Sequence, residues 1–341
     1  MKRIDLRSDT VTVACQEMRQ AMAQAEVGDA VMGEDPTVKQ LEQDLAAFFG
    51  FRHAAFVPSG TMSNQLLLRC QSEPGDAIMA CPGNHIFCYE SGAAAALAGL
   101  QLLPAPLVEG TPYAGIDAAR LAALFPSEGE FYKPPVAIVA LENTNMDGAG
   151  AIYPAEAIAE LGEVCRQLGT KLHMDGARIW HALLDPLVRE ARWLGAACDS
   201  LSVCLSKGLG APVGSMALIN DGQAFLRLRR FQRMYGGFMR QAGHLAAAGL
   251  YALHHNLPKL PQTHVWASRF ADFCRRQFPG AHVHYGGTNI VILEGTEAKN
   301  YKAILEREHN CLLSHLGADR IRAVFHIDVD GAALDRIVGS I

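Results

Sequence analysis

The chain has 341 residues, half of them hydrophobic, and a formal net charge of −5. This length allows a sizeable core and favours two unequal domains, and the mild acidity points to neither nucleic acid nor an anionic membrane as a partner. The opening "MKRIDLRSDT" has no signal-peptide core, and the most apolar piece, residues 91–106, is too short to span a bilayer. We therefore expect a cytoplasmic protein whose nine cysteines are reduced.

The first strong helix signal covers residues 35–50. Asp35 is a good N-cap, Pro36 suits the first helical position, apolar residues recur at helical spacing from Val38, and Gly50 marks the end. A short buried strand at 53–58 and a second helix follow. Further strands are expected at 77–81, 135–143, 169–177, 199–206 and 213–220, with a helix at 155–169.

This alternation of strands and helices predicts an α/β fold with a mostly parallel sheet in an αβα sandwich. After about residue 245 the pattern loosens into a long helical stretch, and strands at 282–295 and 320–330 flank another helix. We expect a smaller C-terminal α+β domain there. The predicted division is an N-terminal segment packing at the active site (1–20), a large domain (21–245) and a small domain (246–341).

The stretch "SVCLSKGLGAPVGSM" at 202–216 places Lys207 after a strand and before a glycine-rich loop. The glycines do not match a dinucleotide fingerprint, and Lys207 precedes its glycine, which a P-loop does not allow. A partly desolvated lysine loses its proton readily and can attack a carbonyl to form a Schiff base. A surface lysine in a turn is the alternative.

Three other stretches supply what pyridoxal phosphate needs besides a lysine. The helix start at Ser59, Gly60 and Thr61 suits a phosphate, Asp175 at a strand end suits the pyridinium nitrogen, and the flat ring of His85 could stack on the cofactor. Taken singly, each has a plainer structural explanation: a capped helix, an aspartate paired with Arg178, and a structural histidine. His282 and His284 share a strand face but lack a third ligand nearby, so no metal is expected.

The sequence resembles the threonine aldolases, a family of fold-type-I pyridoxal phosphate enzymes in the superfamily that also holds the β-eliminating lyases. The resemblance covers nearly the whole chain and includes the stretches "DLRSDTVT", "GDAVMGEDPTV", "PSGTMSN", "HIFCYESG", "LENT", "LHMDGARI", "SVCLSKGLGAPVGS", "GGFMRQAG" and "IRAVFHIDV". It implies a fold-type-I transferase-like architecture and retro-aldol cleavage of L-threonine, L-allo-threonine or a bulkier β-hydroxy-α-amino acid to glycine and an aldehyde.

The resemblance also implies roles for single residues. Lys207 would be the Schiff-base lysine, Asp175 the pyridinium partner and His85 the stacking ring. The residues expected to hold the cofactor are Ser59, Gly60, Thr61, His85, Asp175, Arg178, Ser206, Lys207 and Arg240, and those expected to bind the substrate carboxylate are Ser8, Arg178 and Arg322. Because Arg240 matches an arginine that serves the neighbouring subunit, we expect a homodimer or homotetramer with active sites at the interface.

The chain departs from the family pattern at Met32, Asn145, Met146 and Phe238. The changes at Met32 and Asn145 remove an aromatic hydroxyl and an imidazole that could orient a small β-hydroxyl. The methionines could adapt to a larger apolar side chain, which is therefore expected on the substrate. A pyridoxal phosphate β-eliminating lyase acting on another amino acid is the alternative activity, and a cofactor-binding scaffold without catalysis is a third hypothesis. Two bases could take the β-hydroxyl proton: His85 or a water near the phosphate.

Overall fold

The computed structural model describes residues 3–110, 115–127, 129–184 and 191–339. A seven-stranded sheet forms the centre of the larger part, in the order β2-β8-β7-β6-β5-β3-β4. Strands β7, β6, β5, β3 and β4 run parallel, while β8 is antiparallel to both of its neighbours. The expected mostly parallel α/β sheet is therefore confirmed. The strands are β2 (His53–Val57), β3 (Ala77–Ala80), β4 (Gln101–Pro104), β5 (Val136–Glu142), β6 (Lys171–Asp175), β7 (Ser200–Cys204) and β8 (Ser215–Ile219).

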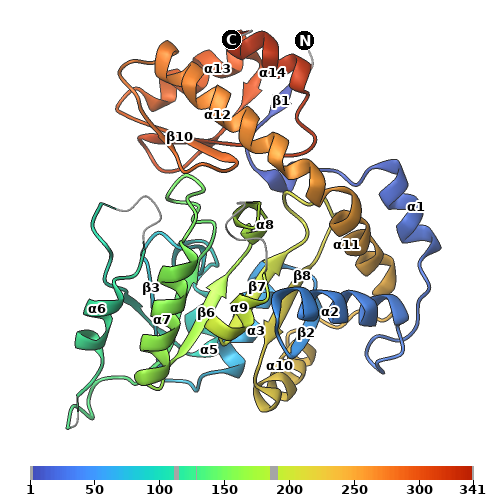
Figure 1. The fold of residues 1–341 in the computed structure, drawn as a ribbon, viewed down its shortest axis with the longest axis vertical. Coiled ribbons are helices and arrows are strands. Elements are labelled where there is room, and N and C mark those ends of the chain that lie inside the picture. Colours follow the sequence, from blue (N-terminus) through green and yellow to red (C-terminus); the bar gives the residue numbers. More distant parts are fainter. Residues whose placement is uncertain (1–2, 111–114, 128, 185–190, 340–341) are drawn as a thin grey trace.

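Helices cover both faces of this sheet (Figure 1). Helix α2 begins and ends as its sequence predicts, because the Asp35 side chain accepts a hydrogen bond from the Val38 N–H at 2.9 Å and Gly50 takes φ +74°. The main helices of this part are α1 (Gln16–Gln24), α2 (Pro36–Phe49), α3 (Gly60–Cys70), α5 (Ala93–Ala98), α7 (Ala155–Gln167), α9 (Trp193–Ala197), α10 (Gly222–Met234) and α11 (Gly243–His255). Helix α5 and strand β4 come from the apolar stretch at 91–106, and no described helix is long and apolar enough to cross a membrane.

The smaller part is built on a four-stranded antiparallel sheet in the order β12-β13-β10-β9. Figure 1 shows it above the large sheet, with both chain ends beside it. Its elements are α12 (Leu260–Gln277), β9 (His282–Tyr285), β10 (Ile290–Glu294), α13 (Ala298–His309), β12 (Ser314–His315), β13 (Arg320–Val324) and α14 (Gly331–Val338). The N-terminal strand β1 (Ile4–Asp5) pairs with β11 (Cys311–Leu312), so the chain start lies against this smaller part.

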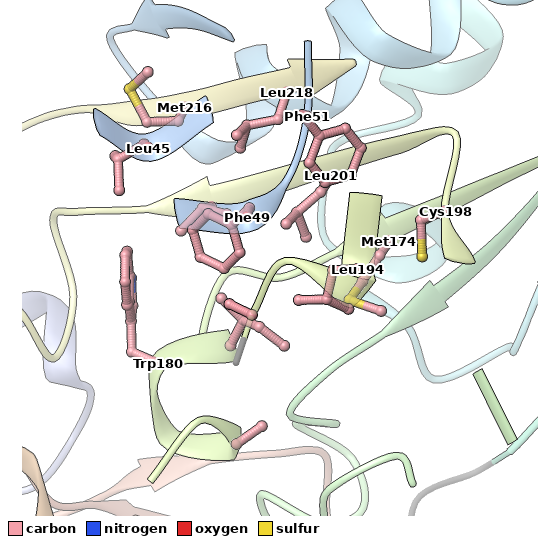
Figure 2. Close-up of a cluster of buried hydrophobic side chains, with 14 of the residues drawn as sticks. Leu45, Phe49, Phe51, Met174, Trp180, Leu194, Cys198, Leu201, Met216 and Leu218 are labelled. Atoms are coloured by element: carbon pink, nitrogen blue, oxygen red, sulfur yellow. The ribbon is translucent and has the colours of Figure 1, made fainter. Parts of the chain in front are cut away.

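A dense core on one face of the large sheet fixes the end of β7. Figure 2 shows Phe49 of α2 between Trp180 of α8 (Ile179–Ala182) and Leu201 of β7, and the Phe49 and Trp180 ring centroids are 5.3 Å apart. The Trp180 indole N–H donates to the carbonyl of Cys204 at 2.9 Å, at the last residue of β7. The core therefore anchors the backbone three residues before Lys207.

Candidate active site

A pocket of about 110 Å³ lies where the parallel strands β6 and β7 end beside the start of α3. It brings together the helix start, the histidine, the aspartate and the lysine that the sequence singled out. Its lining residues are Gly60, Thr61, Asn64, His85, Glu90, Asp175, Ala177, Cys204, Ser206 and Lys207. Ligands of α/β proteins bind at this edge of the sheet, because loops of different strands meet there.

The backbone of Lys207 is held firmly at the entrance to its loop. Its carbonyl accepts hydrogen bonds from the Gly210 N–H at 2.8 Å and from the Thr12 hydroxyl at 3.0 Å. Gly210 has φ +76°, which turns the chain back toward β8 at little steric cost. The loop therefore carries the lysine at a fixed position while its side chain lines the pocket.

The start of α3 offers backbone N–H groups to the same pocket. Ser59 caps this helix, its hydroxyl accepting from the Met62 N–H at 3.2 Å, so the serine side chain is already engaged. A Cβ on Gly60 would lie 2.6 Å from the Cys204 sulfur, so this close approach requires glycine. The remaining N–H groups of the first turn and the helix dipole favour an anion such as a phosphate.

Asp175 is buried in the floor of the pocket without a cationic side chain. Its carboxylate accepts hydrogen bonds from the Asn64 amide at 2.8 Å and from the Ala177 N–H at 3.0 Å, and no described lysine or arginine forms an ion pair with it. The alternative that Arg178 pairs with this aspartate is wrong, because Arg178 pairs elsewhere. A buried carboxylate needs a positive partner, and a pyridinium nitrogen would provide one.

His85 begins the short helix α4 (His85–Cys88), and two carboxylates hold it. Its backbone N–H donates to Glu142 at 2.7 Å, and its ring Nδ1 lies 3.0 Å from Glu90. Burial raises the pKa of the Glu142 carboxyl, as does the nearby charge of Asp175. The His85 side chain keeps 31% exposure and lines the pocket, so its flat ring remains open to a ligand.

The two arginines expected to bind a carboxylate differ in their surroundings. Arg178 is buried and pairs in bidentate fashion with Asp9, through Nε at 2.8 Å and Nη2 at 2.7 Å. Burial alone would raise the pKa of Asp9, but the charge of Arg178 and its hydrogen bonds outweigh burial and hold it well below its usual range. Arg178 therefore already has its carboxylate.

Arg322 is a partly buried cation, and it forms no ion pair with a described carboxylate. Its Nη1 contacts the sulfur of Met146 at 2.7 Å, its Nη2 donates to the carbonyl of Arg7 at 3.3 Å, and its Nε has no hydrogen-bond partner among the described residues. Burial lowers the pKa of Arg322 to about 10, and the positive charge of Arg178 contributes. Arg322 can accept an incoming carboxylate.

The remaining predicted residues lie at the edges. The Ser8 hydroxyl caps the short 3-10 helix Asp9–Val11, next to the partner of Arg178. Arg240 lies on the surface with its side chain 57% exposed and pairs with Asp29 at 2.7 Å. Met32 is also exposed, and Phe238 packs against the guanidinium of Arg229.

Asn145 has its amide engaged within the loop after β5. Its oxygen accepts from the Gly148 N–H at 2.6 Å and its nitrogen donates to Asn84 at 3.3 Å. The change from the family pattern at Asn145 therefore shapes this loop. Met146, one residue later, contacts Arg322 instead.

Sequence reasoning missed several residues that complete the site. They are Asp9, Asn64, Glu90 and Glu142. All four stood in the quoted stretches "DLRSDTVT", "PSGTMSN", "HIFCYESG" and "LENT", and Glu90 follows His85 by five residues. A carboxylate inside an otherwise apolar or small-residue stretch was the available signal, because such a group is buried only with partners.

The large sheet, the lysine loop at its carboxyl edge and the small antiparallel sheet are those of a pyridoxal phosphate enzyme of fold type I. The β-eliminating lyase family model matches residues 5–297, and the chain belongs to that family.

Two curated relatives and one solved structure illustrate the similarity. The chain is 37% identical to probable low-specificity L-threonine aldolase 2 of Arabidopsis thaliana over 350 residues, covering 99% of this chain and 96% of the relative. It is 36% identical to the low specificity L-threonine aldolase of Escherichia coli O157:H7, covering 98% and 97%. The threonine aldolase structure of Leishmania major has a TM-score of 0.81 at 17% identity, covering 98% of this chain and 97% of that one.

Proposed function

We propose that this protein is a pyridoxal phosphate-dependent lyase that cleaves the Cα–Cβ bond of a β-hydroxy-α-amino acid to give glycine and an aldehyde. L-Threonine, L-allo-threonine and bulkier relatives are the substrate class. The observation that carries the proposal is a pocket that joins three features: Lys207, the start of helix α3, and the buried Asp175, which forms no ion pair with a described lysine or arginine. Curated relatives of nearly the same length are named low-specificity L-threonine aldolases.

The residues present fit pyridoxal phosphate. Asp175 would meet the ring nitrogen, His85 would cover the ring, and the start of α3 with Gly60, Thr61 and Ser206 would hold the phosphate. Lys207 would provide the covalent link. When bound, this cofactor supplies an electron sink for the bond that breaks at Cα.

The protein's own contribution is orientation. Arg322 would bind the substrate carboxylate. The ion pair of Asp9 and Arg178, which has no net charge and lies beside Ser8, would form the wall next to it. By fixing the carboxylate, Arg322 would decide which of the other bonds at Cα is presented to the cofactor, and that choice decides the reaction. This arrangement does not require a pocket that encloses the substrate side chain. That agrees with the names of the relatives, which are called low-specificity aldolases.

We further infer a homodimer or homotetramer with active sites at the interface. Arg240 and Met32 support it, since both are exposed on the same surface segment and the Ala30 N–H donates to the Arg240 carbonyl at 2.9 Å. Arg240 would then reach the phosphate of the neighbouring subunit. The cytoplasmic location and the domain boundaries at residues 20 and 245 stay predictions.

Product analysis tests the proposed reaction. Retro-aldol cleavage of L-threonine gives glycine and acetaldehyde, whereas elimination gives 2-oxobutanoate and ammonia. The family description makes elimination the specific alternative. We expect the first pair, and ammonia with a 2-oxo acid as main products would contradict the proposal.

A substrate panel tests the side-chain preference. We expect phenylserine to have a higher kcat/KM than threonine, since one extra apolar contact is worth roughly 1 to 3 kcal/mol. Met32→Tyr should narrow that difference if Met32 reaches a neighbour's site. A clear threonine preference in the wild type would reject the expectation for the side chain and leave the reaction type intact.

A further inference from the structure

A line of hydrogen bonds runs behind the pocket floor and ends on two carboxylates. The amide nitrogen of Gln71 donates to the Ser200 hydroxyl at 2.8 Å, Ser200 lies 2.9 Å from Nδ1 of His173, and Nε2 of His173 lies 3.2 Å from the Asn64 oxygen. The Asn64 nitrogen then donates to Glu90 and Asp175, both at 2.8 Å. All of these side chains except Gln71 are fully or almost fully buried.

Only one assignment of donors and acceptors fits all of the hydrogen bonds in this line. Both N–H bonds of Asn64 go to carboxylates, so its oxygen must accept, and Nε2 of His173 must carry the proton. Nδ1 of His173 is then the acceptor for the Ser200 hydroxyl. Burial lowers the pKa of His173 to about 4, which keeps this imidazole neutral as the arrangement requires.

Glu90 collects three donors in this arrangement. Besides Asn64, its carboxylate accepts from the Gln65 amide at 2.6 Å and contacts Nδ1 of His85 at 3.0 Å. A carboxylate can only accept hydrogen bonds, so the group that faces Glu90 from His85 is a hydrogen on Nδ1, just as Asn64 and Gln65 each present an N–H. Nδ1 of His85 therefore carries a hydrogen in every protonation state of the ring, and the proton that titrates is the one on Nε2.

We propose that Glu90 and Asn64 are positioning residues that keep the proton on Nδ1 of His85, so that Nε2 is the nitrogen that takes up and releases a proton inside the pocket. The inference rests on the proposed function for its chemistry, since it makes His85 the group able to hold the proton of a substrate β-hydroxyl. Asn64 also links this histidine to Asp175, so one amide orients both the ring and the carboxylate of the floor.

The charges facing His85 agree with this role. They are Glu90, Asp175 on β6, Glu142 at the end of β5 and Lys207 after β7, and the Tyr89 ring lies 5.9 Å away. Burial works to lower the pKa of His85, and so does Lys207. The hydrogen bond to Glu90 and the charges of Asp175 and Glu90 outweigh them, and the pKa is raised.

Glu90→Gln is a sharp test because the structure can absorb it. The oxygen of Gln65 is buried and has no hydrogen-bond partner among the residues that the structure describes, so a flipped Gln65 amide can receive the N–H of the introduced side chain. The oxygen of that introduced amide still accepts from His85 and Asn64, so only the charge is lost. Glu163→Gln, which removes an exposed carboxylate from α7, is the matched control.

The measurement is the pH dependence of carbethoxylation of His85, followed by peptide mass spectrometry on the full-length protein without added cofactor. In the wild type we expect a midpoint above the ordinary histidine value of about 6.5. In Glu90→Gln the midpoint should move to lower pH, and in Glu163→Gln it should stay. A wild-type midpoint at or below that value, or the same midpoint in the wild type and Glu90→Gln, would overturn the inference.

The cofactor-loaded enzyme gives a second readout. The acid limb of kcat/KM should move to lower pH in Glu90→Gln, with no such shift in the control. Because the modification experiment needs no turnover, the two proposals fail separately. Correct midpoints without glycine formation would reject the proposed function alone, and an unmoved midpoint in an active aldolase would reject the positioning role alone.

Discussion

The floor of the pocket and the rim beside it differ in how their charged groups are paired. The floor, formed by Asn64, His85, Glu90, Asp175 and Lys207, lies on the large sheet, and its carboxylates have hydrogen-bond donors already in place. The rim is a group of four residues outside the pocket lining, namely Asp9, Met146, Arg178 and Arg322, and it joins the N-terminal segment, the large sheet and strand β13. Glu142 links the rim to the floor, because its carboxylate accepts hydrogen bonds from the backbone N–H groups of Met146 and His85. In the rim, one arginine is neutralised and the other is left without a carboxylate.

The floor is therefore organised before a ligand binds, whereas the rim is completed by the ligand. A buried cation without a partner lowers stability, so its retention beside a pocket indicates a site for an anion. The floor, in contrast, needs a cationic ring nitrogen that pairs with the Asp175 carboxylate, and not a small anion. The following variants test the floor first and then the rim.

The largest effect is expected at Lys207. Lys207→Ala should retain weak cofactor binding through the start of α3 but turn over substrate more slowly by orders of magnitude, because covalent catalysis is lost. Borohydride reduction of the wild type should place a pyridoxyl label on Lys207, read by peptide mass spectrometry. A label on another lysine, or none, would remove the basis for the assignment of the floor.

Next in size is the buried pair of the rim. Arg178→Met should lower the free energy of unfolding by about 3 to 5 kcal/mol, because the buried Asp9 loses the cation that compensates for its burial. Chemical denaturation gives this value. The double variant Asp9→Leu with Arg178→Met should recover much of the loss, and equal losses in the single and double variants would show that the pairing is unimportant.

Arg322→Gln should act on binding rather than on folding. Losing a charge-assisted bidentate contact costs on the order of 2 kcal/mol, or roughly a 30-fold higher KM for amino acids. The denaturation midpoint should be unchanged or higher, since an unpaired buried cation is removed. An unaltered KM would show that Arg322 has only a structural role, and it would contradict the inference that Arg322, unlike Arg178, binds the substrate carboxylate.

The smallest effect is expected from pH. Burial lowers the pKa of His173 and of His264 to about 4 and that of His181 to about 3. Between these values and about 6.5 the unfolded chain binds more protons than the folded one, so stability falls as the pH drops through this window. At pH 5.5 each fully buried histidine should cost roughly 1 kcal/mol relative to pH 7.5.

Denaturation curves at the two pH values measure this loss. His181→Asn, at the junction of α8 and α12 where the ring nitrogens of His181 and His264 lie 2.9 Å apart, should reduce the pH dependence. The exposed His282→Asn serves as its control. A stability that does not change between the two pH values would contradict the burial of neutral imidazoles.

The helix ends and the candidate Schiff-base lysine of this protein can be predicted from local sequence. Helix α2 needs only Asp35, Pro36 and Gly50 at its ends, and Lys207 after an apolar strand and before glycines could be recognised as a Schiff-base candidate. Such features depend on neighbouring residues, so periodicity and capping predict them. The four cofactor motifs could also be placed together, because the ends of parallel strands meet at one edge.

Which charges pair with which was decided only by the tertiary structure. Asp9 and Arg178 are 169 positions apart, and Arg178 alone could equally have served Asp175. Asn64 reaches both Glu90 and Asp175 only because α3 packs beside β6, and Arg322 meets Met146 only because β13 lies against the loop after β5. Side chains of one charge and length are interchangeable in a sequence, and the order of strands and the docking of the two sheets select the partner of each.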